Sequence, residues 1–315
     1  MISFRYHIVS IAAAFLALAV GVVLGSTALS DSVLTGLSNE RGELAERVSE
    51  LENENQGLRA DLEDSGDVVR AASDDVVDGL LEDRSVVLVT TGETRESDRD
   101  AVTRLIEKSG ASVTGRVQLS KKFADPGEGA QLRQLAVRLQ PAGVKFPTSG
   151  DSGGLAGALL GSVLLLDGET AERQSTKDEL TAALSGMSEG GFLTHSDDVE
   201  PAQLAVVLSG DPVGDDHTSG RASRIASFAT QLDRAGAGTV LAGTGQAARE
   251  AGVISTVRAD TAASEQLSTV DNLKSAAGKL GTILALREQL EGDSGQYGFA
   301  ASAKAPLPGM RSSGG

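Results

Sequence analysis

Leucines recur every seven positions near the start of the chain, and the residues between them continue a 3-4 spacing. The a and d positions of this heptad pattern are Leu34, Leu37, Arg41, Leu44, Val48, Leu51, Asn55, Leu58 and Leu62. Leucine at each d position after Leu34, with a valine and an asparagine at a, is typical of a parallel two-stranded coiled coil. We therefore predict a coiled coil over residues 31–66.

The charges that flank the heptads favour a parallel pair. Arg47 of one helix would face Glu52 of the other, and Glu54 would face Arg59. Such exposed pairs contribute little energy but select an orientation. The alternative is an amphipathic helix that lies on the chain's own domain. The partner of the coil is left open between a second copy and a coiled-coil membrane protein.

An uncharged apolar run precedes the heptads and occupies residues 8–29. At about 1.5 Å per residue a helix of this length covers roughly 33 Å, close to the hydrocarbon thickness of a bilayer. Arg5 before the run and Asp31 after it place the N-terminus in the cytoplasm. We expect a signal anchor over residues 1–30, single-pass in the plasma membrane, with the bulk of the chain in the cell envelope. The alternative is a signal peptide cleaved near residues 26–28.

The remainder of the chain alternates short apolar segments with helical patterns. Strands are predicted at 85–92, 111–119, 162–167, 204–209, 238–242 and 253–258. Helices are predicted at 97–110, 128–140, 176–187, 220–235, 245–251 and 268–290. This alternation favours an α/β domain over residues 85–300, with a mainly parallel sheet in a Rossmann- or flavodoxin-like three-layer arrangement.

Two helix starts and three irregular segments complete this organisation. Ser97 and Asp100 form a capping-box pattern, as do Ser268 and Asp271. Residues 67–84 are expected to be an acidic linker, and the glycine-rich residues 151–162 a flexible segment. Residues 301–315 lack a packing pattern and are expected to be a disordered tail.

Charge and cysteine content exclude several classes of function. The chain has 44 acidic and 28 basic residues, a formal net charge of −16, so nucleic-acid binding is not expected. The absence of cysteine excludes disulfides, thiolate metal sites, iron–sulfur clusters and cysteine nucleophiles. No nucleophile, base and acid form a recognisable catalytic set, so we expect neither an enzyme nor a bound cofactor.

A glycine turn suggests a weak nucleotide-binding site. Gly243 and Gly245 open a G-x-G-x-x-A pattern between a predicted strand and a predicted helix, and Asp260 ends the next predicted strand. Such a turn brings backbone N–H groups close to a phosphate, and the acid binds a ribose. The alternative is a tight strand-to-helix turn that needs small residues for packing alone.

A second candidate is an acidic loop after the strand at 204–209. Asp211, Asp215, Asp216 and His217 offer carboxylate oxygens and one imidazole to a divalent ion. Their spacing fits no calcium-binding loop, and the alternative is a solvated acidic loop.

The two ends of the chain resemble a known family. The opening MISFRYHIVSIAAAFLALAVGVVLG and the late STVDNLKSAAGKLGTILALREQLEGDSGQYG, with its closing Gly295-Gln-Tyr297-Gly298, are similar to the actinobacterial copper transporters, the MctB-like proteins. The resemblance extends over essentially the whole chain. It implies copper homeostasis, sometimes described as an outer-membrane channel, and a link to envelope assembly and cell division through a membrane partner. It brings no catalytic or ligand residues to this sequence.

The residues themselves fit direct copper binding poorly. Copper prefers thiolate, thioether and imidazole ligands, whereas the chain has no cysteine, three methionines and three histidines, none at ligand spacing. Copper is therefore implied by the family name alone. The leading hypothesis is a non-catalytic envelope scaffold or regulator, anchored by residues 8–29, that acts through its coiled coil. A component of copper transport or homeostasis is the alternative, and nucleotide or phospho-ligand binding at residues 243–248 is the third.

Overall fold

The computed structural model describes residues 4–147, 150–211 and 218–310; for residues 4–5, 26–40 and 218 it describes the helical backbone without the side chains. These residues form two compact units, 1–65 and 66–315. The first unit is helical wherever it is described. The second contains the α/β domain.

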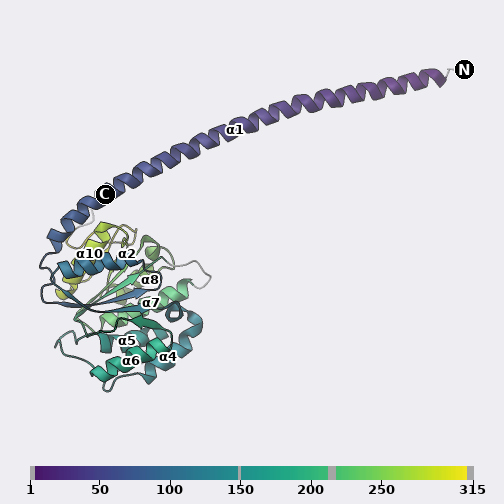
Figure 1. Ribbon diagram of the computed structural model, residues 1–315. Coiled ribbons are helices and arrows are strands. Elements are labelled where there is room, and N and C mark those ends of the chain that lie inside the picture. The colour runs from purple at the N-terminus through teal and green to yellow at the C-terminus, as the bar shows by residue number, and fades with distance from the viewer. Residues whose placement is uncertain (1–3, 148–149, 212–217, 311–315) are drawn as a thin grey trace. The chain divides into compact units, whose positions relative to one another are not determined.

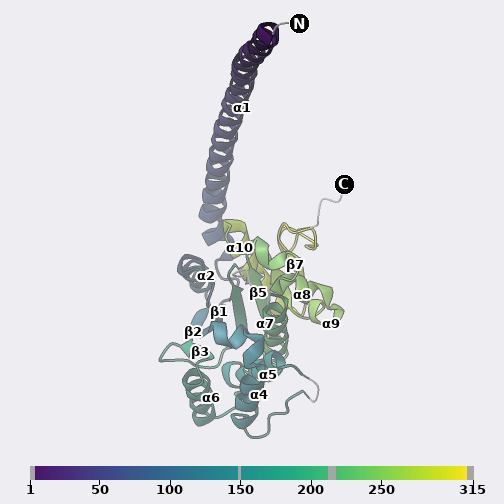
Figure 2. The same cartoon turned by 90° about the vertical axis from the view of Figure 1, so that its right-hand side faces the viewer.

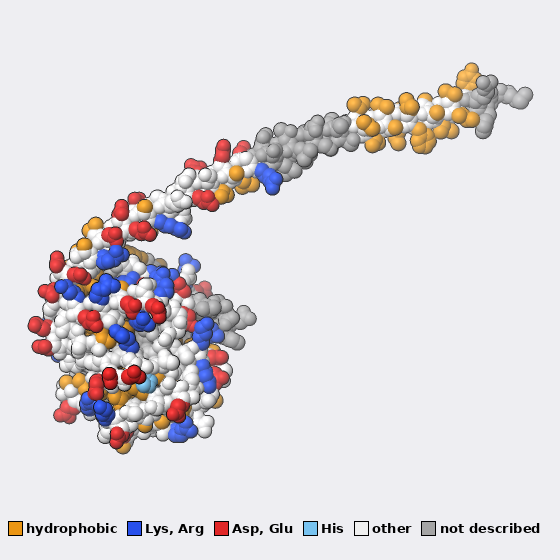
Figure 3. Space-filling model, in the orientation of Figure 1, with side chains coloured by type: hydrophobic (Ala, Val, Ile, Leu, Met, Phe, Trp, Pro, Cys, Tyr) orange, Lys and Arg blue, Asp and Glu red, His pale blue; other side chains and the backbone are white. Residues whose placement is uncertain are grey.

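The apolar run and the heptads belong to one helix, α1 (Phe4–Val77). In the part of the chain that the structure describes, one helical stretch is long and apolar enough to cross a membrane, Tyr6–Gly25. Its side chains are exposed on every side of the helix, and Figure 3 shows apolar side chains along the face in view, with charged ones further along the helix. A helix that is apolar on every side suits a lipid environment.

The last turns of α1 are part of the second unit, so the acidic linker expected at 67–84 is wrong. Residues 66–77 continue the helix, and Val69, Ser73 and Val77 repeat every four positions on one face. Ser73 and Val77 are buried, as is Leu81 in the turn that follows. The acidic residues between them, Asp74 and Asp75, are exposed. The high density of acidic residues in this segment led to the prediction of a linker, although the segment is the amphipathic end of a helix that packs on the domain.

The described residues contain one seven-stranded sheet with the order β3-β2-β1-β4-β5-β6-β7. The strands are β1 (Ser85–Thr91), β2 (Ser112–Leu119), β3 (Leu193–His195), β4 (Leu204–Ser209), β5 (Thr239–Gly243), β6 (Ser268–Val270) and β7 (Gln296–Tyr297). All neighbouring pairs are parallel except β2 and β3. The predicted α/β class and mainly parallel sheet are confirmed, and Figure 2 shows the strands between the helices.

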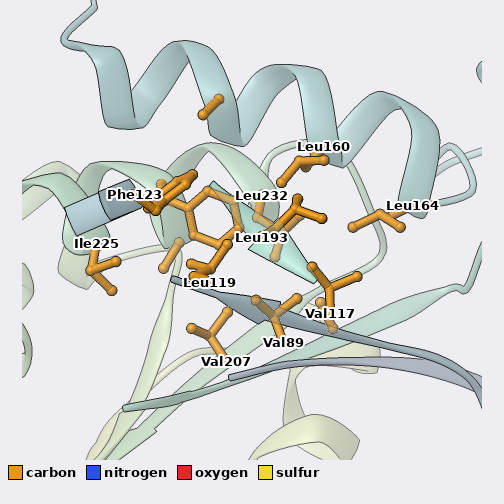
Figure 4. Close-up of a cluster of buried hydrophobic side chains, with 14 of the residues drawn as sticks. Val89, Val117, Leu119, Phe123, Leu160, Leu164, Leu193, Val207, Ile225 and Leu232 are labelled. Atoms are coloured by element: carbon orange, nitrogen blue, oxygen red, sulfur yellow. The ribbon is translucent and has the colours of Figure 1, made fainter. Parts of the chain in front are cut away.

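Helices cover both faces of this sheet, as Figure 1 shows. One face carries α2 (Glu96–Lys108), α10 (Ala276–Leu290) and the end of α1, which share a core with alternate residues of β1, β4 and β5. The other face carries the larger core, drawn in part in Figure 4. Its helices are α3 (Lys121–Ala124), α4 (Gly129–Arg138), α5 (Ser152–Leu164), α6 (Lys177–Glu189), α7 (Thr218–Asp233) and α8 (Val253–Ala259). The shorter α9 (Thr261–Ser264), η1 (Pro126–Glu128) and η2 (Gly245–Ala248) connect these elements.

The glycine-rich segment predicted to be flexible is the buried helix α5, and the strand predicted at 162–167 is wrong. Gly153, Gly157 and Gly161 recur every four residues and face α7. A Cβ at Gly157 would lie 2.5 Å from the carbonyl oxygen of Phe228. Glycine is a poor helix former on its own, so this helix depends on close packing against its neighbour.

Two further predictions of element type and one of a helix cap are wrong. The apolar segment at 253–258 is helix α8 instead of a strand. The helix predicted to begin at Ser268 begins instead after N-cap Ser275, because residues 268–270 form β6. The N-cap of α2 is Arg95 instead of Ser97. Short apolar segments do not distinguish strand from helix by periodicity, and tertiary pairing decides between them.

Residues 301–310 are packed, so the expected disordered tail is wrong for them; residues 311–315 lie outside the described residues. The backbone N–H of Lys304 donates to the carbonyl of Gln296 at 2.8 Å, and the N–H of Gly298 donates to the carbonyl of Ala305 at 3.0 Å. Ala305 is buried. These bonds add one short parallel bridge beside β7.

Candidate functional site

The heptad face of α1 is a candidate interaction surface. Its described apolar side chains are between 51 % and 72 % exposed. They are Leu44, Val48, Leu51, Leu58 and Leu62. The predicted interface residues Leu34 and Leu37 lie outside the described side chains, and Asn55 is exposed on the same helix. The helix therefore presents an apolar stripe that the described part of the chain does not cover.

The charged residues beside this stripe also point to a second helix. Among the described residues no ion pair joins Arg47, Glu52, Glu54 or Arg59 to another part of the chain. The side chains that would pair across a parallel dimer are thus available. The expected coil partner is not tested by a single chain, so it stays a prediction.

A cleft lies at the carboxyl ends of β1 and β4. The chain leaves β1 toward α2 on one face of the sheet and leaves β4 toward α7 on the other face. Parallel sheets bind ligands in the crevice that forms where the connections after two neighbouring strands leave to opposite faces of the sheet. The cavity measures about 70 Å³ and is lined by Thr91, Ser209, Ala222 and Ile225, among others. It has room for a few water molecules or a small ligand group.

The loops at this cleft are tied together. The Thr94 hydroxyl donates to the carbonyl of Leu208 at 2.8 Å, and the N–H of Gly210 donates to the Thr91 hydroxyl at 3.2 Å. A Cβ at Gly210 would lie 1.9 Å from the carbonyl oxygen of Glu93. Only glycine therefore permits this approach of the two loops. The sequence signal for this cleft is a polar residue at the end of each buried strand, Thr91 in β1 and Ser209 in β4.

The glycine turn does not form a dinucleotide site of the expected geometry. Gly243 is the last residue of β5, one position beyond the predicted strand, and Gly245 opens η2, a single turn of four residues. A Cβ at Gly243 would lie 2.8 Å from the Cβ of Ala247, so this glycine is required for packing. Asp260 does not end a strand; it caps α9 and accepts a hydrogen bond from the N–H of Ala263 at 3.1 Å.

Asp211 is held by residues from two neighbouring strand ends. The Thr244 hydroxyl donates to its Oδ1 at 2.6 Å, and the Lys274 ammonium forms an ion pair with Oδ2. Lys274, and then Thr244, hold the pKa of Asp211 below its usual value. The other three predicted ligands, Asp215, Asp216 and His217, lie outside the described residues. Within the residues that are described, no three His, Cys, Asp or Glu side chains group as a metal site would require.

The closing Gly-x-Tyr-Gly motif is structural. Burial, and then the hydrogen bond to Glu288, raise the pKa of the Tyr297 hydroxyl. Its backbone carbonyl accepts from Nη2 of Arg258 at 2.8 Å. Arg258 also forms a buried ion pair of 2.8 Å with Asp271. This pair could not be predicted from the sequence, because its two residues lie on elements whose types were predicted wrongly.

Known proteins are similar to this chain over nearly its whole length. Residues 1–308 match the model of a family described as copper transport outer membrane protein, MctB. Proteins named copper transporter MctB from Mycobacterium tuberculosis and Mycobacterium bovis are each 33 % identical over 308 residues, which is 96 % of this chain and 98 % of theirs. The protein of that name from Mycobacterium leprae is 33 % identical over 311 residues, with the same coverage.

Proposed function

Starting from the membership of this chain in the MctB family, which is described as copper transport outer membrane protein, we propose that the chain itself acts as a non-catalytic scaffold or regulator of the cell envelope. The membrane helix would anchor it, with the N-terminus in the cytoplasm and the α/β domain outside. The heptad face of α1 would bind a second helix. The resemblance that the two ends of the chain indicated is confirmed by the family match.

The exposed apolar stripe of α1 is the observation that carries this proposal. Burial of a leucine or valine side chain stabilises an assembly by about 1.5–3 kcal/mol relative to exposure. Five such side chains on one face of a polar helix are therefore a strong drive to association. A contiguous apolar stripe on an otherwise charged surface is typical of a protein interface.

The partner we propose is a second copy of the same chain in parallel orientation. Arg47 and Glu54 at g positions complement Glu52 and Arg59 at e positions of the other copy. Asn55 at an a position pairs with itself in a parallel two-stranded coil and disfavours other registers. Two copies inserted in one membrane would enter the coil from the same side, which also favours the parallel orientation.

The test introduces one thiol into a chain that has none. The variant Leu51→Cys places it at a central d position, and Ser49→Cys places it on the outward face as a matched control. Both are expressed in the native envelope and oxidised, and the dimer is measured on non-reducing gels. We expect an efficient disulfide for Leu51→Cys and little for Ser49→Cys.

A membrane-impermeant maleimide tests the topology in the same cells. Labelling of Ser49→Cys in intact cells supports the outward orientation, and labelling only after permeabilisation contradicts it. External labelling of Leu51→Cys without a disulfide would contradict the homodimer and direct the search to a different coiled-coil partner.

The alternative function is direct handling of copper, which rests on the family name. The described residues offer Met187, which is buried in the core, and three exposed side chains that lie far apart in the sequence, His7, His195 and Met310. Titration of the purified full chain with Cu(I) and Cu(II) distinguishes the two functions. A scaffold should bind no copper above background, whereas stoichiometric binding of copper would favour the transport function.

A further inference from the structure

A basic pocket lies where the end of α1 meets α2 and α10. Five cations line it, namely Arg70, Arg95, Arg104, Lys274 and Lys279, of which Lys274 is paired with Asp211. Two carboxylates, Asp74 and Asp98, accompany them. This balance opposes that of the whole chain, in which acidic residues outnumber basic ones by 44 to 28. In Figure 3 several Lys and Arg side chains lie over the region of α2 and α10.

The floor of the basic pocket is a cluster of ion pairs around the buried Asp98, in which Lys279 is half-buried and the Arg95 side chain is 54 % exposed. The Lys279 ammonium lies 2.9 Å from Oδ1 of Asp98, and their side chains are 14 % and 6 % exposed. Arg95 contacts the other oxygen of Asp98, also at 2.9 Å. One carboxylate thus holds two cations, which leaves a net positive charge in a partly desolvated place. Charges in such a place interact more strongly than charges in water.

The wall of the pocket contains two arginines that have weak ion pairs or none among the described residues. Arg104 has no hydrogen-bond or ion-pair partner among the described residues and is exposed at the pocket. Arg70 pairs with Asp67 one turn earlier on α1, and both side chains are about two-thirds exposed. Such exposed surface pairs are weak, so Arg70 can leave Asp67 to contact a ligand at small cost.

The start of α2 adds backbone donors to the same pocket. Its N-cap, Arg95, makes no side-chain cap within the described structure, and Ser97 in the first turn lines the pocket. The first N–H groups of a helix lack partners inside the helix and favour an anion. The thirteen residues of α2 make this a full helix terminus.

We propose that the basic pocket binds a phosphate-bearing ligand. Two arginines on facing helices can each donate two hydrogen bonds to a phosphate, and the half-buried Lys279 supplies a fixed positive charge behind them. Arg70 and Arg104 are the residues that would contact it. The phosphate can belong to a soluble molecule or to an anionic lipid headgroup. All of the contributing residues lie in the second unit, so the proposal is independent of the coiled coil.

The test measures binding to the full chain in nanodiscs of phosphatidylcholine, which carry no net charge. Pyrophosphate, inorganic phosphate and short-chain phosphatidylglycerol are titrated separately by calorimetry at low salt. The test variant carries Arg70→Gln and Arg104→Gln. The matched control carries Arg133→Gln and Lys145→Gln, which remove the same charge from exposed positions outside the basic pocket. Circular dichroism checks that both variants are folded.

We expect saturable binding of at least one probe, weakened at least tenfold in the test variant and less than twofold in the control. Preference for pyrophosphate would identify a soluble ligand, and preference for phosphatidylglycerol a lipid headgroup. No saturable binding of any probe would overturn the proposal. Equal weakening in both variants would also overturn it, because it would indicate a general effect of net charge.

Discussion

Gly298 and Asp271 lie so close that a Cβ at position 298 would be 2.1 Å from Oδ1 of the aspartate. The φ angle of Gly298 is +126°, which disfavours any other residue. The same oxygen accepts a hydrogen bond from the N–H of Phe299 at 2.8 Å. Asp271 in turn forms an ion pair with the buried Arg258. Burial lowers the pKa of that arginine.

The variant Gly298→Ala should therefore displace the carboxylate that pairs with Arg258. Removing a partner from a buried ion pair costs about 3–5 kcal/mol, so we expect a loss of about 3 kcal/mol in the free energy of unfolding. The control is Gly292→Ala, which has a φ of +85° but open space at its Cβ. Strain alone should cost it about 1 kcal/mol. Chemical denaturation followed by circular dichroism measures both, and equal losses would contradict the role of Asp271.

The stability of the domain should depend on pH through Asp233. Burial raises the pKa of this carboxyl to about 7, although the N–H of Thr239 donates to it at 2.7 Å. The unfolded chain, with a pKa near 4, releases its proton first. The folded state therefore binds more protons between about pH 4 and 7, and stability falls as the pH rises through this range.

The variant Asp233→Asn should remove this part of the pH dependence. Asparagine keeps an acceptor for the N–H of Thr239 and carries no charge at any pH. We expect the wild-type free energy of unfolding to fall relative to the variant by a few kcal/mol, at about 1.4 kcal/mol per pH unit. Denaturation midpoints at several pH values between 4 and 8 test this. Parallel curves for the two proteins would contradict it.

Close packing of α5 on α7 predicts different outcomes for two glycines that lie one turn apart on α5. Alanine at Gly157 would place its Cβ 2.5 Å from the carbonyl oxygen of Phe228. Overpacking of this kind costs about 1–3 kcal/mol. Alanine at Gly154 finds its nearest neighbour at 3.4 Å and gains helix propensity, so we expect a change of less than about 1 kcal/mol in either direction. Thermal unfolding compares the two, and similar losses would argue against the packing.

Truncation tests where the folded domain begins. Val77 and Leu81 are almost fully buried in the core that α2 and α10 share. A chain of residues 66–315 should therefore unfold cooperatively. A chain of residues 85–315 lacks both side chains and should lose about 3–6 kcal/mol, at 1.5–3 kcal/mol for each. Equal stability of the two chains would show that the end of α1 is dispensable.

Local repetition in the sequence was sufficient for the long elements. The heptads repeat over many residues, and the apolar run is long and uncharged, so each pattern predicts a helix. Both lie on α1. The alternation of apolar segments with amphipathic helices likewise predicted the parallel sheet. Strands such as β1 and β4 are buried on both faces, and a continuous apolar segment is the direct consequence.

Tertiary structure alone decided the elements that have little periodicity. The helix α5 is stable because its glycines allow α7 to pack closely against it. The segment α8 is helical although its sequence resembles a strand. The pair of Arg258 with Asp271 is thirteen positions apart and joins a helix to a strand end. The basic pocket combines residues 70–74, 95–105 and 274–279. The amino-acid sequence determined where helices and strands are favoured, but side chains distant in the chain meet only when the sheet and its two helical layers form.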